Sequence, residues 1–306
     1  MTVHRLIGSP LAAIIFLVTA GTVSAQTQKE LLDELDRTIE EAESYVSAKE
    51  LRIKTIENTL HSRGVSPERQ YRIYGELFDE YQPFNYGKAV ETLDKQMEIA
   101  MLLGDKSKLN DVYLKEAMLN TAAGEFLEAR NDLARVDTTI FTKEQEIAYC
   151  NVQQRFWFDY DENQKGADKS MLRKVAYYRE RLLALADPSS SLSRYVTVRK
   201  YIDEKYFAQA DFINRHSLSR MDPASHDYAN LAYFQARICE SLNRREEMKN
   251  WFIRSAMADI KTATKDNASL FSLADALFKD GDYARAFKYS SFSLEDAIAF
   301  DAKLRQ

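Results

Sequence analysis

Apolar side chains recur in alternating steps of three and four residues between residues 27 and 60. This spacing puts them on one face of a helix and predicts a long amphipathic helix over residues 26–64. Lys49 alone interrupts the apolar stripe, and Gly64 is placed to end the helix or to follow its end. The apolar members of the stripe are Leu32, Leu35, Ile39, Ala42, Val46, Ile53, Ile56 and Leu60.

The same stripe has the heptad spacing of a coiled coil. Two interpretations follow from it. The helix packs against the next helix pair of the same chain, or it forms the seam of a homodimer through residues 27–60. We favour packing within the chain and keep the homodimer as the alternative.

A second pattern begins near residue 66 and repeats to the end of the chain. Its clearest unit is SLFSLADALFKDGDYARAF, residues 269–287, in which Gly281 and Asp282 separate two helical stretches. This unit resembles the tetratricopeptide (TPR) consensus, with small residues at positions 8 and 20, glycine at 15 and an aromatic residue at 17. Small residues let the two helices approach closely, and glycine permits the left-handed conformation that ends the first helix.

The same frame fits four upstream segments. The matching residues are Leu77, Tyr86 and Ala89; Ala117, Gly124, Phe126 and Ala129; Val198, Lys205, Phe207 and Ala210; and Ala236, Asn243 and Met248. The gap between the second and third segments has room for one degenerate unit, residues 143–160 paired with residues 169–186. We therefore expect an all-α, TPR-like α-solenoid of about six helical hairpins over residues 65–306, preceded by the long amphipathic helix.

Composition agrees with a helical fold. Nine Gly and five Pro are too few for a sandwich or a barrel, whose many turns consume these residues. Pro188 and the three serines that follow it are interpreted as a loop between repeats rather than as a hinge. Cys150 and Cys239 fall two repeats apart, too far for a disulfide, so we expect two buried thiols.

The N-terminus has the features of a secretion signal. Residues 11–18 (LAAIIFLV) form a short apolar run after Arg5, and small residues precede Gln26. A spanning helix needs roughly 20 apolar residues, which disfavours a membrane anchor. No Cys follows the run, which disfavours a lipoprotein. We therefore expect a signal peptide over residues 1–25, cleaved after Ala25, and an exported, periplasmic protein.

Charge and motifs argue against several classes of function. The net charge of −5 does not provide the basic face with which nucleic-acid-binding proteins displace counterions. No HExxH, GxSxG, P-loop or CxxC motif is present and the four His are scattered, so we expect no metal, no cofactor and no enzymatic activity. The aromatic run at residues 155–160 (RFWFDY) is interpreted as hairpin core rather than as a binding platform.

A solenoid of this type binds its partners on the concave surface, which the first helix of each TPR unit lines at positions 2, 5, 9 and 12. Tyrosine at such positions offers contact area and a hydrogen bond at small entropic cost, which suits a protein, a peptide or a small polar ligand. In this register the candidate binding residues are Tyr71, Tyr74, Phe78, Tyr81, Tyr195, Arg199, Asn230, Tyr233, Arg237, Glu240, Phe271, Asp275 and Phe278.

Three segments together resemble a more specific family. They are LLDELDRTIEEAESYVSAKELRIKTIENTL, YRIYGELFDEYQPFNYGKAVETLDKQMEIAMLLGD and SAMADIKTATKDNASLFSLADALFKDGDYARAFKYSSFSLEDAIAF. They are similar to the exported N-terminal half of membrane-bound regulators in Gram-negative gut bacteria, a domain of unknown function. The resemblance covers nearly all of the mature chain. It implies a periplasmic TPR sensor region followed by a membrane helix, a coiled coil and a cytoplasmic DNA-binding region.

The chain ends at Gln306, before any segment that corresponds to those later parts. We therefore expect a truncated form or a stand-alone relative, and we carry over neither DNA binding nor a membrane contact. The expected function is a non-enzymatic periplasmic module that binds a ligand or a protein, as the sensor part of a membrane-bound transcriptional regulator. The alternatives are a glycan-binding accessory protein for nutrient uptake and a stand-alone scaffold.

Overall fold

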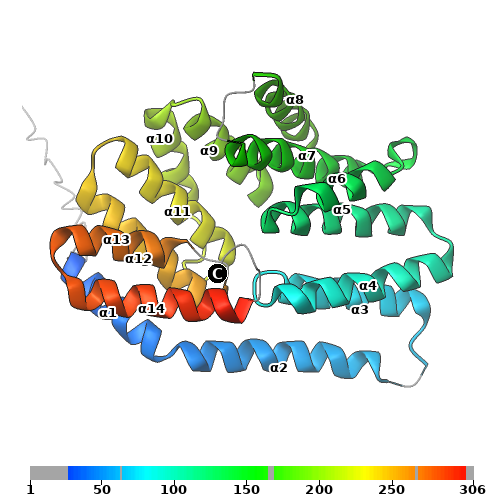
Figure 1. Ribbon diagram of the computed structural model, residues 1–306, viewed down its shortest axis with the longest axis horizontal. Coiled ribbons are helices and arrows are strands. Elements are labelled where there is room, and N and C mark those ends of the chain that lie inside the picture. The colour runs from blue at the N-terminus through cyan, green and yellow to red at the C-terminus, as the bar shows by residue number, and fades with distance from the viewer. Residues whose placement is uncertain (1–26, 63, 165–168, 266–267, 301–306) are drawn as a thin grey trace, which may run out of the picture.

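The computed structural model describes residues 27–62, 64–164, 169–265 and 268–300. Within these ranges it contains fourteen α-helices, one short 3-10 helix and no strand, which confirms the all-α prediction (Figure 1). The predicted signal peptide lies outside the described residues, as do the last six positions of the predicted repeat domain. None of the helices in the described ranges is both long and apolar enough to cross a bilayer.

Twelve of the helices form six consecutive hairpins, as the repeat pattern predicts. The degenerate unit is also confirmed, because two helices occupy that gap in the register. The pairs are α3 (Pro67–Tyr81) with α4 (Tyr86–Leu103), α5 (Lys106–Ala123) with α6 (Phe126–Arg135), α7 (Lys143–Asn163) with α8 (Lys169–Leu185), α9 (Ser191–Asp203) with α10 (Phe207–Leu218), α11 (His226–Ser241) with α12 (Arg245–Lys261), and α13 (Ser269–Asp280) with α14 (Tyr283–Phe300); η1 (Thr138–Ile140) precedes α7.

The hairpins pack closely where the pattern predicts small residues. The residues at positions 8 and 20 of four units are all buried: Ala117, Ala129, Val198, Ala210, Ala236, Met248, Ala274 and Ala286. Cys150 and Cys239 are free and buried, as expected of small core residues. Phe156, from the aromatic run, is buried edge-on against Phe126 at a centroid distance of 6.0 Å, which agrees with the hairpin-core interpretation.

The predicted turn residues have a left-handed backbone. At position 15 of four units the φ angles are +79° at Gly124, +63° at Lys205, +57° at Asn243 and +87° at Gly281. The N–H of Lys205 still donates to the Ile202 carbonyl at 3.0 Å, so this helix ends in the same way as the others. A Cβ in the left-handed region lies too close to the carbonyl oxygen that follows it, so lysine is strained where glycine is not.

We expect Lys205→Gly to raise the free energy of unfolding by about 1 kcal/mol, because glycine adopts this conformation without the steric cost. Lys205 is exposed, so the loss of its side chain removes little packing. Urea denaturation followed by circular dichroism measures the change. Gly281→Ala is the matched reverse substitution and should destabilise by a similar amount. A loss of stability in Lys205→Gly would contradict the assignment of strain.

The N-terminal segment forms two helices rather than the single long helix that the heptad pattern predicted. The first, α1 (Gln28–Glu40), begins at Thr27, whose hydroxyl accepts a hydrogen bond from the Glu30 N–H in a capping box. The second, α2 (Ala42–Leu60), starts directly after Glu41. The chain changes direction at this point, although the apolar spacing continues through it.

The division follows from where the two helices pack. Leu31 and Leu35 of α1 belong to a core cluster made with α11, α12, α13 and α14, at the far end of the chain. Ile53 of α2 packs instead with Ile73 and Leu77 of α3, in the first hairpin. Two separate surfaces therefore hold the two halves of the stripe, and one straight helix does not satisfy both.

Lys49, the polar residue in the predicted stripe, is also buried. Its Nζ lies 2.9 Å from Oε2 of Glu80 on α3, so a salt bridge continues the contact that the apolar residues make. The stripe is thus used within the chain, as we favoured. The alternative homodimer through residues 27–60 loses the apolar surface on which it depended.

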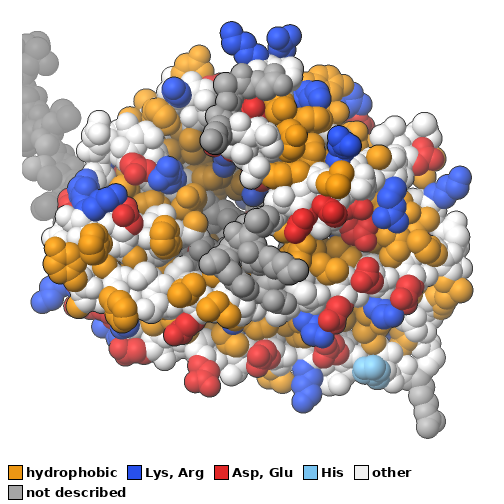
Figure 2. All heavy atoms as spheres, in the orientation of Figure 1, with side chains coloured by type: hydrophobic (Ala, Val, Ile, Leu, Met, Phe, Trp, Pro, Cys, Tyr) orange, Lys and Arg blue, Asp and Glu red, His pale blue; other side chains and the backbone are white. Residues whose placement is uncertain are grey.

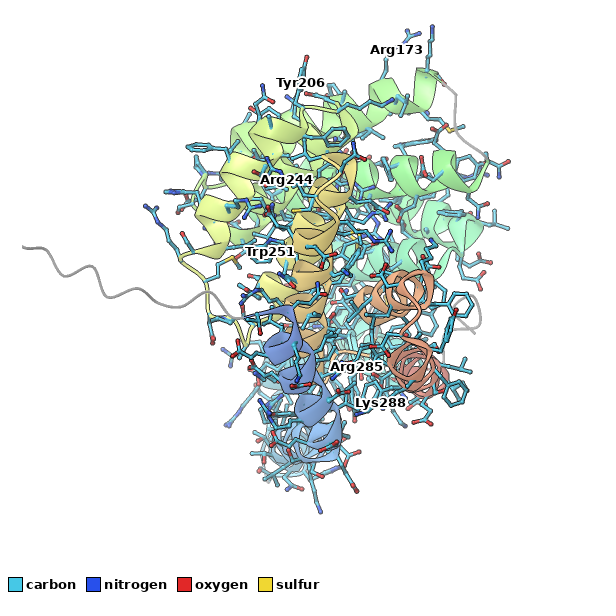
Figure 3. The ribbon with its side chains drawn as sticks, turned by 90° about the vertical axis from the view of Figure 1, so that its left-hand side faces the viewer. Arg173, Tyr206, Arg244, Trp251, Arg285 and Lys288 are labelled. Carbon is cyan, nitrogen blue, oxygen red and sulfur yellow. The ribbon has the colours of Figure 1, made fainter. Side chains whose placement is uncertain are left out.

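Helices α1 and α2 join the two ends of the arc of hairpins (Figure 1). Arg285 and Lys288 reach from α14 toward α1 (Figure 3), where the Asp36 carboxylate accepts from Arg285 Nε at 3.0 Å and from Lys288 Nζ at 2.9 Å. Elsewhere in the chain, the Lys265 N–H donates to the Pro83 carbonyl at 2.8 Å, which ties the loop after α12 to the loop after α3. The solenoid is therefore closed on itself.

Candidate functional site

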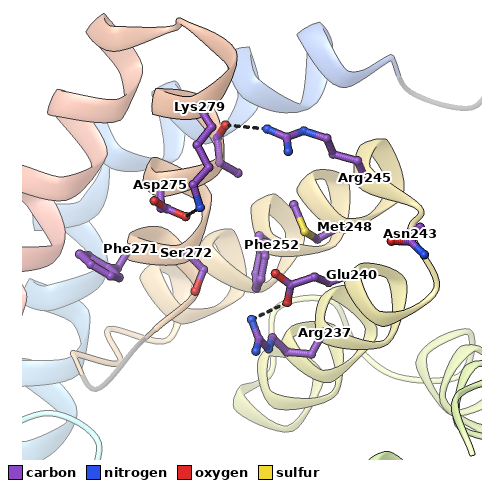
Figure 4. A pocket seen from close by; sticks show the side chains of 11 residues that line it. Arg237, Glu240, Asn243, Arg245, Met248, Phe252, Phe271, Ser272, Asp275 and Lys279 are labelled. Atoms are coloured by element: carbon purple, nitrogen blue, oxygen red, sulfur yellow. Dashed lines mark hydrogen bonds and ion pairs between the residues drawn. The ribbon is translucent and has the colours of Figure 1, made fainter. Parts of the chain in front are cut away.

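Four of the predicted binding residues meet in one groove between the first helices of the last two units. Arg237 and Glu240 lie on α11, and Phe271 and Asp275 lie on α13 (Figure 4). The groove has a volume of about 370 Å³, and Met248 and Phe252 of α12 form an apolar floor between the two walls. We call it the α11–α13 groove.

The charges around the α11–α13 groove are paired with one another. Arg237 lies 2.5 Å from Glu240, and Lys279 lies 2.6 Å from Asp275. The guanidinium of Arg245 donates to the Ala276 carbonyl at 3.4 Å. A ligand that enters here would meet neutralised pairs around an apolar recess, so this groove is suited to an apolar side chain rather than to a charged group.

The predicted residues of the first unit are mostly not open to solvent. Tyr71 and Phe78 are buried, and the Tyr71 hydroxyl donates to the Lys108 carbonyl at 3.1 Å. Tyr74 and Tyr81 are half-buried in the cluster that α3 makes with α2, and the Tyr81 hydroxyl donates to Glu57 at 2.9 Å. These tyrosines therefore hold α3 between its neighbours.

The neighbouring face of α3 lines a larger groove, with a volume of about 560 Å³. Its residues on α3 are offset by one position from the predicted set, since Arg72, Gly75 and Asp79 follow Tyr71, Tyr74 and Phe78. Across from them stand α5 and α7. We call it the α3–α7 groove, and its lining residues are Tyr71, Arg72, Gly75, Glu76, Asp79, Gln96, Asp111, Leu114, Lys115, Met118, Ala148, Asn151 and Val152.

Lys115 on α5 is the unusual residue of the α3–α7 groove. Its Nζ is half-buried 5.0 Å above the centre of the Phe78 ring and makes one long hydrogen bond, 3.4 Å, to Oε1 of Gln96. Burial lowers the pKa of Lys115, although the attraction of Asp79 and Asp111 opposes the shift. The described part of the chain gives Lys115 no salt bridge, so the partly desolvated ammonium is attracted by these carboxylates without direct contact.

Gly75 makes room for this arrangement. A Cβ at position 75 would lie 3.0 Å from Nε2 of Gln96 and 3.6 Å from Nζ of Lys115. Glycine inside a helix lowers stability by about 1 kcal/mol relative to alanine. Its presence at position 75 therefore indicates that the side chains of Gln96 and Lys115 approach the backbone of α3 closely. This glycine was the signal in the sequence that could have pointed to the groove.

The acidic residues of the groove differ in how firmly they are held. Asp111 accepts hydrogen bonds from Gln145 Nε2 at 2.7 Å and from the Tyr71 hydroxyl at 3.5 Å. Glu76 and Asp79, by contrast, are exposed on the groove wall and form no salt bridge within the described residues. Lys115 and Asp79 therefore face the same space and attract each other, but no salt bridge joins them.

The remaining predicted residues lie in neither groove. Tyr195 packs on Phe234 with a centroid distance of 4.9 Å, and Arg199 stacks over the Phe158 ring at 4.2 Å. Tyr233 is half-buried between two core clusters, and Asn230 lies half-buried one turn before it. Phe278 is exposed beside Tyr283 at the turn between α13 and α14.

No group of three or more His, Cys, Asp or Glu side chains in the described ranges comes together in a way that could hold a metal ion. The titratable residues of the two grooves are on helices. One groove offers a ligand an apolar floor, and the other offers an ammonium and carboxylates that form no salt bridge with each other.

The sequence matches the family described as the SusR N-terminal TPR domain over residues 39–306. A comparison with curated proteins finds no match. TPR domains are generally non-catalytic modules that mediate protein interactions. Together with the six hairpins, the close-packed small residues and the match over most of its length, this shows that the chain belongs to the SusR N-terminal TPR domain family.

Proposed function

We propose that this domain binds a segment of a partner protein in the α3–α7 groove. The observation that carries the proposal is Lys115, a partly desolvated ammonium with no salt bridge, beside the exposed carboxylates of Glu76 and Asp79. A buried charge is favourable only when it is paired, so a ligand that brings a carboxylate to Lys115 gains more here than in water.

The lining of the groove also determines which residues of the ligand fit next to that carboxylate. Leu114, Met118 and Val152 give it an apolar lining between the charges. Met is adaptable in shape, which suits the side chains of a peptide. The matching ligand is an extended peptide that carries both an acidic and a basic residue with an apolar residue near them.

We further propose that the domain is exported and acts as the sensing part of a regulator. The apolar run at residues 11–18 with small residues before Gln26 supports export. The family description supports a place in a SusR-type system. Occupancy of the groove would then be the signal, and the closed solenoid would keep α3 and α5 in fixed positions for the ligand.

The test begins with selection of binding peptides from a displayed random library against the purified chain. Fluorescence anisotropy then measures Kd of the best peptide for the wild type and for Lys115→Met and Asp79→Asn. Each variant is expected to weaken binding about tenfold, which corresponds to about 1.4 kcal/mol. Both substitutions keep the size of the side chain, so the fold is expected to stay intact.

Lys279→Met is the matched control, because it removes a lysine from the α11–α13 groove instead. We expect it to leave Kd unchanged. If Lys279→Met weakens binding and Lys115→Met does not, the partner binds in the α11–α13 groove and this proposal is wrong. If the library yields no peptide and a glycan array yields a ligand, the domain is a glycan-binding protein.

A further inference from the structure

A small cavity lies between α7, α8 and α9, and none of its lining residues lines either groove. It has a volume of about 210 Å³. Phe158 of α7 and Leu172, Val175 and Ala176 of α8 form its apolar wall, and Arg179 of α8 lies next to them. Figure 2 shows apolar side chains over α7 and α8, at the top of the molecule, with Lys and Arg side chains near them. We call this space the α8–α9 cavity.

Arg179 is only 5% exposed, yet its guanidinium group is incompletely paired. Nη2 donates to Oδ2 of Asp203 at 2.9 Å and to Oε1 of Gln154 at 3.4 Å. Nε is buried without a hydrogen-bond partner in the described part of the chain. A buried donor without an acceptor is unfavourable, so a ligand that brings an acceptor to Arg179 gains more here than at an exposed arginine.

The buried charges next to the cavity favour an acceptor that is negatively charged. Asp203 is shared between two guanidinium groups, because its Oδ1 accepts from Nε of Arg199 at 3.0 Å while its Oδ2 accepts from Arg179. The side chains of Arg179, Arg199 and Asp203 are 6%, 29% and 21% exposed. Two largely buried cations thus share one carboxylate, which leaves an excess of positive charge.

The acidic groups at the rim of the cavity oppose an anionic ligand only weakly. Oε1 of Glu204 lies 3.9 Å from Nζ of Lys200, one turn earlier, which balances its charge. Glu180 is exposed, and water and salt screen the charge of an exposed group. The excess positive charge of the buried groups therefore determines which ligand is attracted.

We propose that the α8–α9 cavity binds a small carboxylate that carries a short aliphatic chain. The carboxylate accepts from the guanidinium group of Arg179, and the chain packs on Phe158, Leu172 and Val175. Leu172 is 46% exposed, so a bound chain removes apolar surface from water. A small inorganic anion would leave this wall uncovered, and a hydrocarbon without a carboxylate would leave Arg179 without its acceptor. The cavity is thus a second ligand site, separate from the peptide groove.

Isothermal titration calorimetry of the purified chain tests the proposal with hexanoate, butanoate and hexan-1-ol. Hexanoate is expected to bind. Butanoate has two methylene groups fewer and is expected to bind about fifteenfold more weakly, from the free energy of burying each methylene. Hexan-1-ol keeps the chain and loses the charge, so it is expected to bind at least tenfold more weakly than hexanoate.

Two variants locate the ligand in the cavity. Ala176→Leu fills part of the cavity from an exposed position of its wall, so the fold is expected to stay intact and hexanoate to bind at least tenfold more weakly. Arg179→Lys keeps the positive charge next to Asp203 and removes Nε, so it is expected to weaken hexanoate and to leave hexan-1-ol unchanged. The matched control is Ala184→Leu, an exposed alanine of α8 outside the cavity, and circular dichroism checks each fold.

A further control separates the cavity from the α3–α7 groove, because Lys115 could also attract a carboxylate. Lys115→Met is expected to bind hexanoate as the wild type does. A loss of hexanoate binding in Lys115→Met or in Ala184→Leu, or normal binding in Ala176→Leu, would overturn the proposal. So would a wild type that does not bind hexanoate, or one that binds only a peptide with a carboxyl-terminal leucine, since the site would then take a chain end rather than a small molecule.

Discussion

Leu35→Ala is expected to lower the free energy of unfolding by about 3 kcal/mol, the usual cost of a large-to-small change in a well-packed core. Leu35 has no exposed surface and lies in the same cluster as Ile253 of α12 and Leu273 of α13. The side chain therefore links the first helix of the chain to its last units. Its removal leaves a cavity at the closure of the solenoid.

Leu51→Ala is the control for this experiment. Leu51 lies on α2 and is 66% exposed, so its truncation should change the free energy of unfolding by less than about 0.5 kcal/mol. Urea denaturation followed by circular dichroism measures both variants. Equal effects at the two positions would show that α1 is not docked on the last hairpins, and the closed arrangement would then be wrong.

The second large effect is a dependence of stability on pH that comes from Glu116 of α5. Its Oε2 is buried without a hydrogen bond, and the nearest cation, Nη1 of Arg135, is 3.6 Å away. Burial, together with repulsion from Asp132, raises the pKa of Glu116 from 4.5 to about 7. The folded protein therefore holds a proton on this carboxyl more tightly than the unfolded chain does.

The sign of the effect follows from linkage. Because the pKa of Glu116 is higher in the folded state, its contribution to stability is present below the unfolded pKa and is lost as the pH rises through about 7. We expect Glu116→Gln to be more stable than the wild type by about 2 to 3 kcal/mol near pH 8, and the difference to vanish near pH 4.5.

Urea denaturation of both proteins across this pH range measures the difference. Glu50→Gln on α2 is the control, since Glu50 is exposed and makes no hydrogen bond or salt bridge in the described residues. A gap between the wild type and Glu116→Gln that is the same at both ends of the range would contradict the raised pKa.

The hairpins could be predicted from the sequence because their signals are local. Ala117 and Ala129 lie on neighbouring helices, and Gly124 ends the first of them in the left-handed region. Small residues between the paired helices and a left-handed residue at the turn are both needed within one unit of about 40 residues. The same pattern then repeats along the chain. Even Lys205, which no turn preference favours, occupies the same place in the register and takes the same φ.

The closure could not be predicted, because its signals lie at opposite ends of the chain. Asp36 and Arg285 are ordinary surface-type residues in sequence, and nothing in the heptad indicates that the stripe is divided between two docking surfaces. The heptad pattern gives the number of apolar positions and their face. It does not predict the direction in which the helix with these apolar positions runs, because packing against the rest of the chain determines that direction.

The residues of α3 that line the α3–α7 groove were not predicted, because the open face of α3 is offset by one position from the TPR binding positions. The TPR positions on α3 select Tyr71, Tyr74 and Phe78, which are large and aromatic and so are drawn into the core and against α2. Because α2 covers one side of α3, the open face is rotated by one residue toward Gly75 and Asp79. In the last unit, where no such helix covers the groove, Phe271 and Asp275 lie where the same positions predict.

The crystal structure of the chain with a selected peptide is the measurement that tests the proposed function most directly. We predict peptide density between α3, α5 and α7, with a peptide carboxylate within about 3 Å of Nζ of Lys115, the distance of a charge-assisted hydrogen bond. Peptide bound in the α11–α13 groove, or with no acidic group near Lys115, would contradict the assignment of the α3–α7 groove as the binding site.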